Sequence, residues 1–338
     1  MNNMIDDRRV IIVDFNPLVH TYLFGGAPPL TCTVTIDNVP TTIDTTIQTH
    51  TIKAIHRWSN RGRNPVAVCF DSPCPSRKYY FAKNEVTPEG GVVDYKGGRK
   101  SLPSKVFSAI NMTALLLNQA GVCVYKLDNY ESDDLIYACV QKAKQQYPNL
   151  PIDIITNDAD MLPLVDDQVS VFLRTKKQPW AESKELIKPH YIQVTPANFQ
   201  EVVEDMTPYR NILVPYNTLL LAKLLRGDKS DNVPPKADWK PKMYKELITV
   251  LEEEAEDLSG LFRYGGEEQL NKICTVLGKY VEDEDLEHIR KIYRGINLNG
   301  EFGGTNPRKP AVLTTEIKGY SSLKLQQQVA NLNINLPV

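Results

Sequence analysis

Acidic residues stand directly after several apolar segments of this 338-residue chain. Asp14 follows residues 10–13, Asp71 follows 66–70, and a third acidic group comes shortly after 152–156. The segments 131–134 and 228–231 add further carboxylates. The candidate metal ligands are Asp14, Asp71, Glu131, Asp133, Asp134, Asp158, Asp160, Asp228 and Asp231. Five separated segments therefore supply the acids of one possible site.

A cluster of this many carboxylates needs compensation. Two like charges about 4 Å apart repel by about 4 kcal/mol at an effective dielectric constant near 20. Either several acids take up protons, or divalent cations bind among them. Ligand sets made only of oxygen favour Mg²⁺ or Mn²⁺, and two such ions roughly 3.5–4 Å apart catalyse in-line displacement at phosphorus. The histidines form no H-x-x-x-H pair and lie outside these segments, which argues against zinc.

The elements that position these acids can be predicted from the apolar pattern. Residues 10–13, 66–70, 122–125 and 152–156 are apolar and mostly β-branched, which predicts buried strands. Helical spacing over about 45–60, 104–120 and 132–147 occupies the intervals. This alternation predicts an α/β fold, a parallel sheet with helices on both faces. Acids that follow its strands would share the carboxyl edge, where ligands bind at the point where strand order reverses.

Simpler interpretations exist for each acidic group. Acids at a helix start favour the helix macrodipole and cap its free amides, and this alone would explain residues 131–134. An aspartate after a strand is common turn chemistry, and residues 228–231 could form a solvated turn. The conjunction of several groups at one predicted edge is what favours a metal site.

The segment 77–105 is basic and aromatic. It carries seven basic residues against three acidic ones and is net +4 within a chain of net charge -2. Basic groups neutralise phosphates and aromatic rings stack on bases, so the segment is predicted to grip nucleic acid. An ordinary solvated loop has the same composition. The residues of this segment that we expect to contact the substrate are Arg77, Lys78, Tyr95, Lys96, Arg99 and Lys100.

Other catalytic motifs are missing from the sequence. Arg99 stands where a phosphate-binding Walker loop needs glycine before Lys-Ser. No G-x-S-x-G elbow is present, and no G-x-G-x-x-G follows a strand. Asp14 is followed by Phe15-Asn16 rather than by a second aspartate two residues on, which argues against an aspartyl-phosphate phosphatase.

Length and composition indicate about two folded domains. The chain is 42% hydrophobic and 24% charged, which excludes a wholly disordered protein. Residues 1–202 are expected to form the α/β domain, and helical patterns at 219–225, 243–257 and 267–280 predict a helical domain over 203–338. The six cysteines form no C-x-x-C pair, and the sequence has neither a signal peptide nor an apolar run of about 18 residues. We therefore expect a soluble cytoplasmic protein that is monomeric and does not bind a membrane.

Taken in order, the motifs resemble the 5′→3′ exonuclease/flap endonuclease family, especially its bacteriophage ribonuclease H members. They are Asp14, 70–73 (FDSP), 95–99 (YKGGR), 131–134 (ESDD), 157–160 (NDAD) and 227–234 (GDKSDNVP). The resemblance implies a PIN-like nuclease domain with a helical arch over residues 77–112 and a DNA-binding helical domain after it. It also implies Mg²⁺-dependent hydrolysis of RNA primers and DNA flaps from the 5′ end, in the bacterial host cytoplasm if the gene is carried by a phage.

The resemblance also implies roles for single residues. Asp14, Asp71, Glu131 and Asp133 would hold the first metal, with Asp158 bridging or close by. Asp160, Asp228 and Asp231 would hold or orient the second, and Asp134 matches the last acid of its motif. Lys96 and Arg99 match the basic residues of the arch that approach the scissile phosphate.

The sequence departs from the family's pattern after residue 233. The family's Gly-x-Gly hairpin, which grips duplex DNA with a bound K⁺, is replaced here by residues 234–239 (PPKADW), so K⁺ is not expected. The apolar C-terminal tail could dock on a sliding clamp, and a single-strand-binding protein is another replication partner to consider. Two other functions remain open, a PIN-type ribonuclease on structured RNA and a non-catalytic nucleic-acid-binding protein of the same fold.

Overall fold

The structure is a computed structural model of the chain. It describes residues 8–24, 29–84, 94–97, 103–174, 191–204, 206, 214–215, 218–227, 231–233, 241–254, 258, 260–299 and 311–330. Residues 85–93 and 98–102 of the predicted arch, and residues 234–239 where K⁺ was considered, lie outside this described part.

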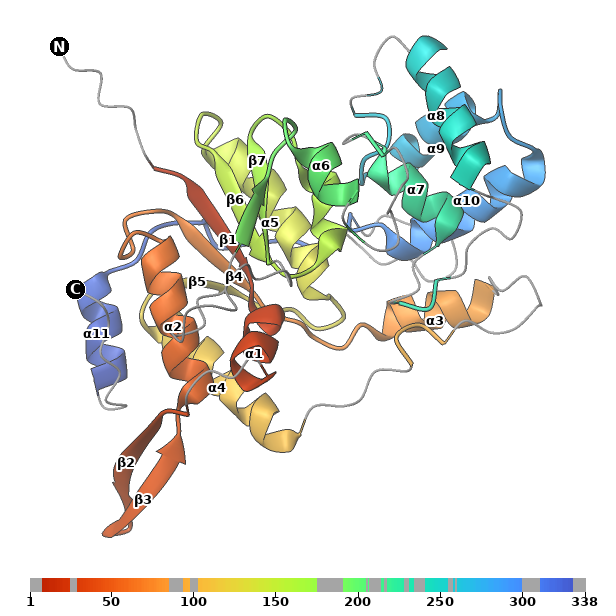
Figure 1. Ribbon diagram of the computed structural model, residues 1–338. Helices are drawn as coiled ribbons and strands as arrows, with labels where there is room; N and C mark the ends of the chain where they lie inside the picture. Colours follow the sequence, from red (N-terminus) through yellow and green to blue (C-terminus); the bar gives the residue numbers. More distant parts are fainter. Residues whose placement is uncertain are drawn as a thin grey trace, which may run out of the picture.

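A six-stranded sheet forms the centre of the molecule (Figure 1). Its order is β5-β4-β1-β6-β7-β8, and every neighbouring pair is parallel except β7 with β8. The strands are β1 (Val10–Asp14), β4 (Val66–Cys69), β5 (Cys123–Tyr125), β6 (Ile152–Thr156), β7 (Val169–Arg174) and β8 (Tyr191–Val194). The four predicted strands are confirmed, and β7 and β8 extend the sheet beyond them.

Alternate residues of the central strands pack on opposite faces of the sheet. In β1, Val10 and Ile12 belong to one hydrophobic cluster, and Ile11 and Val13 belong to the other. All five residues of β1 and of β6 are buried. A strand covered on both sides reads as a continuous apolar run, which is why these strands were evident from the sequence.

Helices cover both faces, as predicted. The helices α1 (Phe15–Phe24), α2 (Thr46–Trp58) and α4 (Ser104–Gln119) contribute to the second cluster, and α5 (Ser132–Gln146) lies in the first. The predicted helices 45–60, 104–120 and 132–147 agree with α2, α4 and α5. Two further elements approach the site, α3 (Pro75–Asn84) and the 3-10 helix η1 (Ala159–Leu164).

The later part of the chain is mainly helical. Figure 1 shows α7 (Leu219–Arg226), α8 (Pro241–Glu254), α9 (Glu267–Leu277) and α10 (Asp283–Ile296) gathered at one end of the molecule, with the short α6 (Phe199–Glu204) beside the sheet. Residues of α7, α9 and α10 share the first hydrophobic cluster with the sheet. The division into domains at residue 202 stays a prediction. None of the helices in the described ranges is long and apolar enough to cross a membrane.

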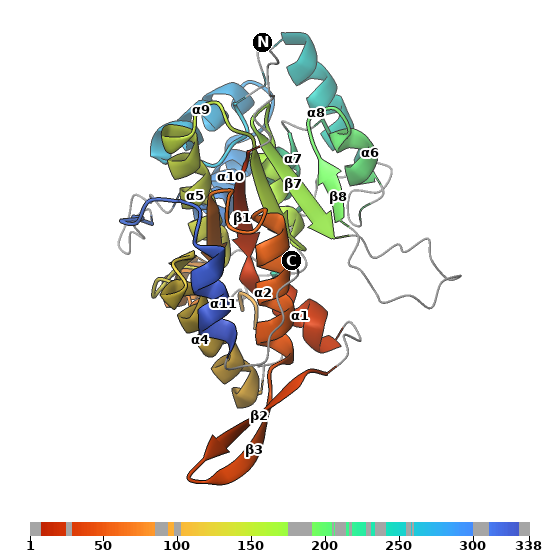
Figure 2. The ribbon, with the colours of Figure 1, turned by 90° about the vertical axis from the view of Figure 1, so that its left-hand side faces the viewer.

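The segment 311–330 returns to the α/β region. Lys318 forms an isolated antiparallel bridge with Val66 at the start of β4, and the Tyr320 amide donates to the Gly62 carbonyl at 3.0 Å. Helix α11 (Ser322–Ala330) then packs beside α4, as Figure 2 shows. We call residues 311–330 the C-terminal strap. The expected second domain over 203–338 thus includes a segment that packs on the first.

The hairpin β2 (Thr31–Ile36) and β3 (Val39–Asp44) projects from the molecule below α1 and α2 in Figure 1. Its turn residues, Asp37 and Asn38, have φ of 49° and 62°, a conformation that aspartate and asparagine tolerate better than most residues. The residues of β3 are mostly exposed, so the strand lacks the continuous apolar run that marked the central sheet.

The approach of the strap to the sheet predicts a difference between two glycine variants. Gly62 and Gly121 have φ of 85° and 87°, so alanine costs about 1–2 kcal/mol of backbone strain at either position. Only at Gly62 would the added Cβ collide, 2.3 Å from the Tyr320 carbonyl oxygen, whereas Gly121 faces open space. Gly62→Ala should therefore lower the free energy of unfolding by at least about 1 kcal/mol more than Gly121→Ala.

Urea denaturation of the two variants measures this difference. Equal losses of stability would show that the strap does not approach residue 62 in solution.

Candidate metal-binding site

Acids from the ends of three strands converge at the carboxyl edge of the sheet. Asp14 ends β1, Asp71 lies two residues after β4, and Asp158 lies two residues after β6. The strand order reverses between β1 and β6, because the chain moves from β1 to β4 and β5 on one side and then to β6 and β7 on the other. Open α/β sheets bind ligands at such a switch point.

Asp14 is almost completely buried, with 1% of its surface exposed. Its Oδ2 accepts a hydrogen bond from the Thr156 hydroxyl at 2.7 Å, whereas Oδ1 is buried without a hydrogen-bond partner. Burial, followed by the charges of Asp71 and Asp158, raises the pKa of Asp14 to about 8. A buried carboxylate oxygen that has no hydrogen-bond partner and lies near other acids can bind a cation.

Asp71 connects β4 to two neighbouring segments. Its Oδ2 accepts from the Asn16 side-chain amide at 2.7 Å, and its Oδ1 accepts from the Ser132 backbone amide at 2.7 Å. The second bond places the carboxylate at the N-terminus of α5, where the free amides and the macrodipole favour a negative charge.

The start of α5 presents three acids with different tasks. Glu131 is the N-cap and forms a capping box with Asp134, whose Oδ2 accepts from the Glu131 amide at 3.0 Å. The capping interpretation is thus correct for these two residues. Asp133 lines the cavity instead, and desolvation together with the charge of Asp158 raises its pKa.

Asp231 and Lys96 close the site from another side. The Lys96 amine lies 2.8 Å from Glu131 Oε1 and 3.6 Å from Asp231 Oδ2. The Tyr95 hydroxyl donates to Asp231 Oδ2 at 3.0 Å and lies 3.2 Å from Glu131 Oε2. Burial would raise the pKa of Glu131, but the cations Arg77 and Lys96 outweigh it and hold that pKa at about 2.

Lys223 was not singled out in the sequence. It lies in α7 with 4% of its surface exposed, and it forms an ion pair with Asp160 of η1. The signal that could have revealed it is its position as the one cation within the apolar run of residues 219–225. A fully buried lysine is rare unless it is paired, so such a position predicts an acidic partner nearby.

Several of these groups line one cavity. The polar part of its wall comprises Arg77, Tyr95, Asp133, Asp160, Lys223 and Asp231. Asp158 adjoins it, and burial together with the charge of Asp160 raises the pKa of Asp158 to about 7. Without a metal ion, the repulsion among the carboxylates is therefore reduced in two ways. Some of the acids keep their protons, and others form ion pairs with buried lysine and arginine side chains.

Whether a metal ion fits depends on how these side chains are arranged. In the described part of the chain, no three His, Cys, Asp or Glu side chains are already arranged to hold one ion. The cause is visible in the contacts, because Lys96 and Lys223 engage oxygens of Glu131 and Asp160. The donors are nevertheless all carboxylate oxygens, and the buried Asp14 Oδ1 lacks a partner. The site fits a hard divalent cation, provided that these lysines release the carboxylates.

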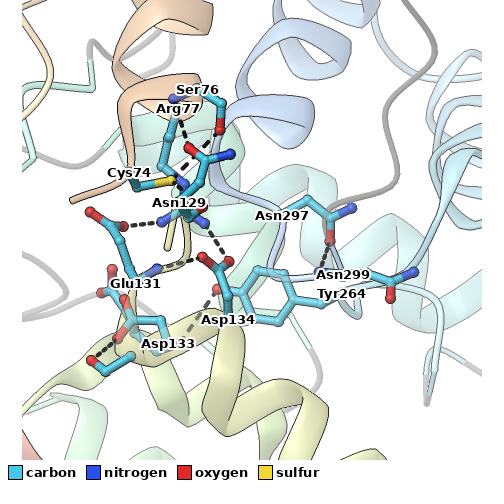
Figure 3. Close-up of polar contacts among 12 residues, drawn as sticks. Cys74, Ser76, Arg77, Asn129, Glu131, Asp133, Asp134, Tyr264, Asn297 and Asn299 are labelled. Atoms are coloured by element: carbon cyan, nitrogen blue, oxygen red, sulfur yellow. Dashed lines mark hydrogen bonds and ion pairs between the residues drawn. The ribbon is translucent and has the colours of Figure 1, made fainter. Parts of the chain in front are cut away.

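Three of the predicted residues are buried and have internal contacts in the structure. Arg77, predicted to contact nucleic acid, is 5% exposed and pairs with Glu131 and Asp134 (Figure 3). Tyr95, predicted likewise, is 6% exposed, and its ring stacks on Phe81, which is itself fully buried. Asp134, predicted to bind metal, is fully buried and uses both oxygens, one for Arg77 and one for the α5 cap.

The remaining predicted residues divide into three groups. Lys78 is on the surface, 3.4 Å from the exposed Asp94, where it is free to meet solvent and solutes. Arg99, Lys100 and Asp228 lie outside the described residues. The acids that the structure brings to the site are Asp14, Asp71, Glu131, Asp133, Asp158, Asp160 and Asp231.

Fold and site together define an α/β protein with an acidic pocket at the carboxyl edge of a parallel sheet. Residues 9–195 match the family model described as the 5′-3′ exonuclease N-terminal resolvase-like domain. Because the match covers more than half of the chain, the chain belongs to this family. The resemblance inferred from the six motifs is confirmed.

Curated relatives agree with this assignment. A 5′-3′ exonuclease of Halalkalibacterium halodurans is 27% identical over 237 residues, covering 70% of this chain and 63% of the relative. A DNA polymerase I of Lactococcus lactis is 30% identical over 144 residues, which are 42% of this chain and only 14% of the polymerase. The chain thus corresponds to a small part of that larger enzyme.

Solved structures support the fold. A T5 protein co-crystallised with metal ions matches with a TM-score of 0.51 and 14% identity, covering 86% of this chain and 90% of its own. A bacteriophage T5 flap endonuclease in complex with DNA and metal ions gives a TM-score of 0.50 and 15% identity, with 86% and 89% coverage. At this identity the likeness concerns the fold, and it confirms the predicted α/β architecture.

The raised pKa values predict how the stability of the metal-free protein depends on pH. Unfolded aspartates titrate near pH 4, whereas Asp14 and Asp158 titrate at about 8 and 7 in the folded chain. The folded state therefore keeps protons that the unfolded state has released. Stability should fall as pH rises from about 5 to about 8, and melting temperatures measured in EDTA will show this.

An Asp14→Asn variant is the control, because it removes one of the titrating groups and should flatten the decline. Added Mg²⁺ should raise the melting temperature more at pH 8 than at pH 5.5, because a metal binds the ionised carboxylates. A melting temperature in EDTA that is constant or rises between pH 5 and 8 would contradict the assignment.

Proposed function

We propose that this protein is a divalent-metal-dependent 5′→3′ exonuclease and flap endonuclease that removes RNA primers and DNA flaps during replication. The observation that carries the proposal is the convergence of acids from the end of β1, the segments after β4 and β6, and the start of α5, which lie close enough for their charges to interact beside a cavity lined by further acids. Membership of the 5′-3′ exonuclease family supports it, as does the similarity to part of DNA polymerase I.

The structure suggests which residues would hold the ions. Asp14, Asp71 and Glu131 would hold the first with Asp133, and Asp158 would lie between two ions. Asp160 and Asp231 would serve the second together with Asp228. Asp134 is not in our ligand set because both of its oxygens are engaged. Bound Mg²⁺, or Mn²⁺ in its place, would activate the attacking water and stabilise the leaving oxygen.

The chain's own residues prepare the site for this chemistry. Thr156 holds Asp14 through Oδ2 and leaves Oδ1 toward the site. Asn16 and the Ser132 amide fix Asp71 from both sides. Lys96 is 21% exposed in its side chain, the most accessible of the cations paired with the site's acids. On release from Glu131 it would donate to the phosphoryl oxygens, with Arg99 as a second donor.

The substrate class follows from the charges and from the family. DNA or an RNA–DNA hybrid with a 5′ end or flap would lie over the carboxyl edge, with Lys78 among the phosphate contacts. A monomer acting in the cytoplasm, with a sliding clamp or single-strand-binding protein as partner, completes the proposal.

Replacing one acid between the two ions tests the proposed function. Asp158→Asn should lower Mg²⁺-dependent cleavage of a 5′-labelled flap DNA at least about 1,000-fold, because several kcal/mol of transition-state stabilisation depend on the ions. Binding of the same DNA in Ca²⁺ should persist. Asp167→Asn, at an exposed acid past η1, is the matched control and should cleave normally.

The wild-type chain distinguishes the other functions in the same assay. Mg²⁺-independent binding with no cleavage would indicate a non-catalytic binding protein, and cleavage of structured RNA alone would indicate a PIN-type ribonuclease. Full cleavage by Asp158→Asn would contradict the metal assignment.

Lys96→Ala separates catalysis from metal binding. Loss of one preorganised cationic donor should lower kcat about 100-fold to 1,000-fold. The Mg²⁺ concentration for half-maximal rate should not rise, because the variant also removes a cation that competes for Glu131. An unchanged kcat with a higher Mg²⁺ requirement would mean that Lys96 only holds the carboxylate.

A further inference from the structure

Arg77 stands in the wall of the cavity with its side chain almost completely buried. Its side chain is 4% exposed and extends from α3 to the N-terminus of α5. One end of the guanidinium group pairs with Glu131, and the other donates to Asp134 Oδ1 at 2.7 Å (Figure 3). The first end also lies 3.5 Å from the Tyr95 hydroxyl. These contacts engage both ends of the planar fork.

The two acids are the two halves of the α5 capping box. The Glu131 side chain accepts from the Asp134 amide, and the Asp134 side chain accepts from the Glu131 amide. Arg77 therefore ties together residues that already fix each other's backbone. A proposed metal ligand held in this way has little freedom to turn.

The helix that carries Arg77 is itself anchored at both ends. At its start, the Ser76 amide donates to Asn129 Oδ1 at 3.1 Å. Toward its end, the Tyr80 hydroxyl donates to the Lys291 carbonyl at 3.1 Å, and the Phe81 ring packs so closely on Gly295 that a Cβ there would lie 2.2 Å from it. Arg77 could shift toward a bound substrate only if these contacts of α3 were broken.

The two oxygens of Glu131 are held by different cations. Arg77 and Tyr95 hold Oε2, and Lys96 holds Oε1. Lys96 has a side chain 21% exposed, against 4% for Arg77. If Lys96 turns to the substrate, Oε1 becomes available while Oε2 remains fixed.

We infer that Arg77 is a positioning residue of the proposed metal site, which keeps Glu131 oriented and makes no contact with nucleic acid. The inference rests on the proposed function of that site. Groups that orient metal ligands typically contribute about 10-fold to 100-fold to metal affinity or activity. Arg77→Lys keeps the charge but not the fork that engages both acids. It should weaken Mn²⁺ binding, measured by calorimetry on the full chain, about 10-fold to 100-fold.

Lys78→Gln is the matched control on the same helix, because the Lys78 side chain is 64% exposed. It should leave Mn²⁺ affinity unchanged. Arg77→Lys should leave the affinity for flap DNA in Ca²⁺, and the salt dependence of that affinity, unchanged. If Arg77 contacts a phosphate instead, the variant will bind DNA more weakly, because lysine cannot form the paired contacts of the guanidinium group, and it will bind Mn²⁺ normally. That result, or no change in either affinity, overturns the inference.

A double variant covers the case in which Arg77→Lys does not fold. Arg77→Gln with Asp134→Asn removes both buried charges, so that neither is left uncompensated. The double variant should show the same loss of Mn²⁺ affinity, whereas Asp134→Asn alone, which keeps the Arg77–Glu131 pair, should bind Mn²⁺ within about threefold of wild type. Equal Mn²⁺ affinities in these two variants would overturn the inference. A wild-type chain that neither binds Mn²⁺ nor cleaves DNA would overturn the proposed function itself.

Discussion

Repulsion among carboxylates at the carboxyl edge of the sheet is the constraint on which the site depends. The acids come from β1, the segments after β4 and β6, the start of α5, and Asp231. Each like-charged pair at about 4 Å costs about 4 kcal/mol at an effective dielectric constant near 20. The metal-free protein limits this cost by keeping protons on Asp14 and Asp158 and by placing Arg77, Lys96 and Lys223 among the other acids. A divalent cation would replace part of that compensation.

The packing of the hydrophobic core holds the carboxylates close together in spite of their repulsion. Alternate residues of β1 pack into the two clusters on either side of the sheet, which fixes where Asp14 emerges. Helix α5 is fixed through its capping box, and α3 is held between the Asn129 loop and α10. The helical region beyond α6 also contributes directly, because Lys223 of α7 reaches Asp160. The proposed site is thus built by both parts of the chain, and the carboxylates have little freedom to move apart.

The sequence revealed the sheet and the acids more clearly than the cations. Strands buried on both faces are continuous apolar runs, so β1, β4, β5 and β6 and the acids after them could be predicted. The exposed hairpin β2–β3 lacks such a run. Arg77 was assigned to nucleic acid because local net charge carries no information about burial, and a long-range ion pair leaves no local pattern. Lys223 and the strap depend on contacts between distant segments, and only Lys223 carries a local signal, its place as the one cation in an apolar run.

Anomalous diffraction from crystals soaked in Mn²⁺ tests the central claim most directly. The account predicts two anomalous peaks among the acids at the carboxyl edge of the sheet, one beside Asp14 and the other near Asp160, with the Lys96 amine turned away from Glu131. Crystals with no peak in this cavity, or with manganese only at other positions on the surface, would contradict it.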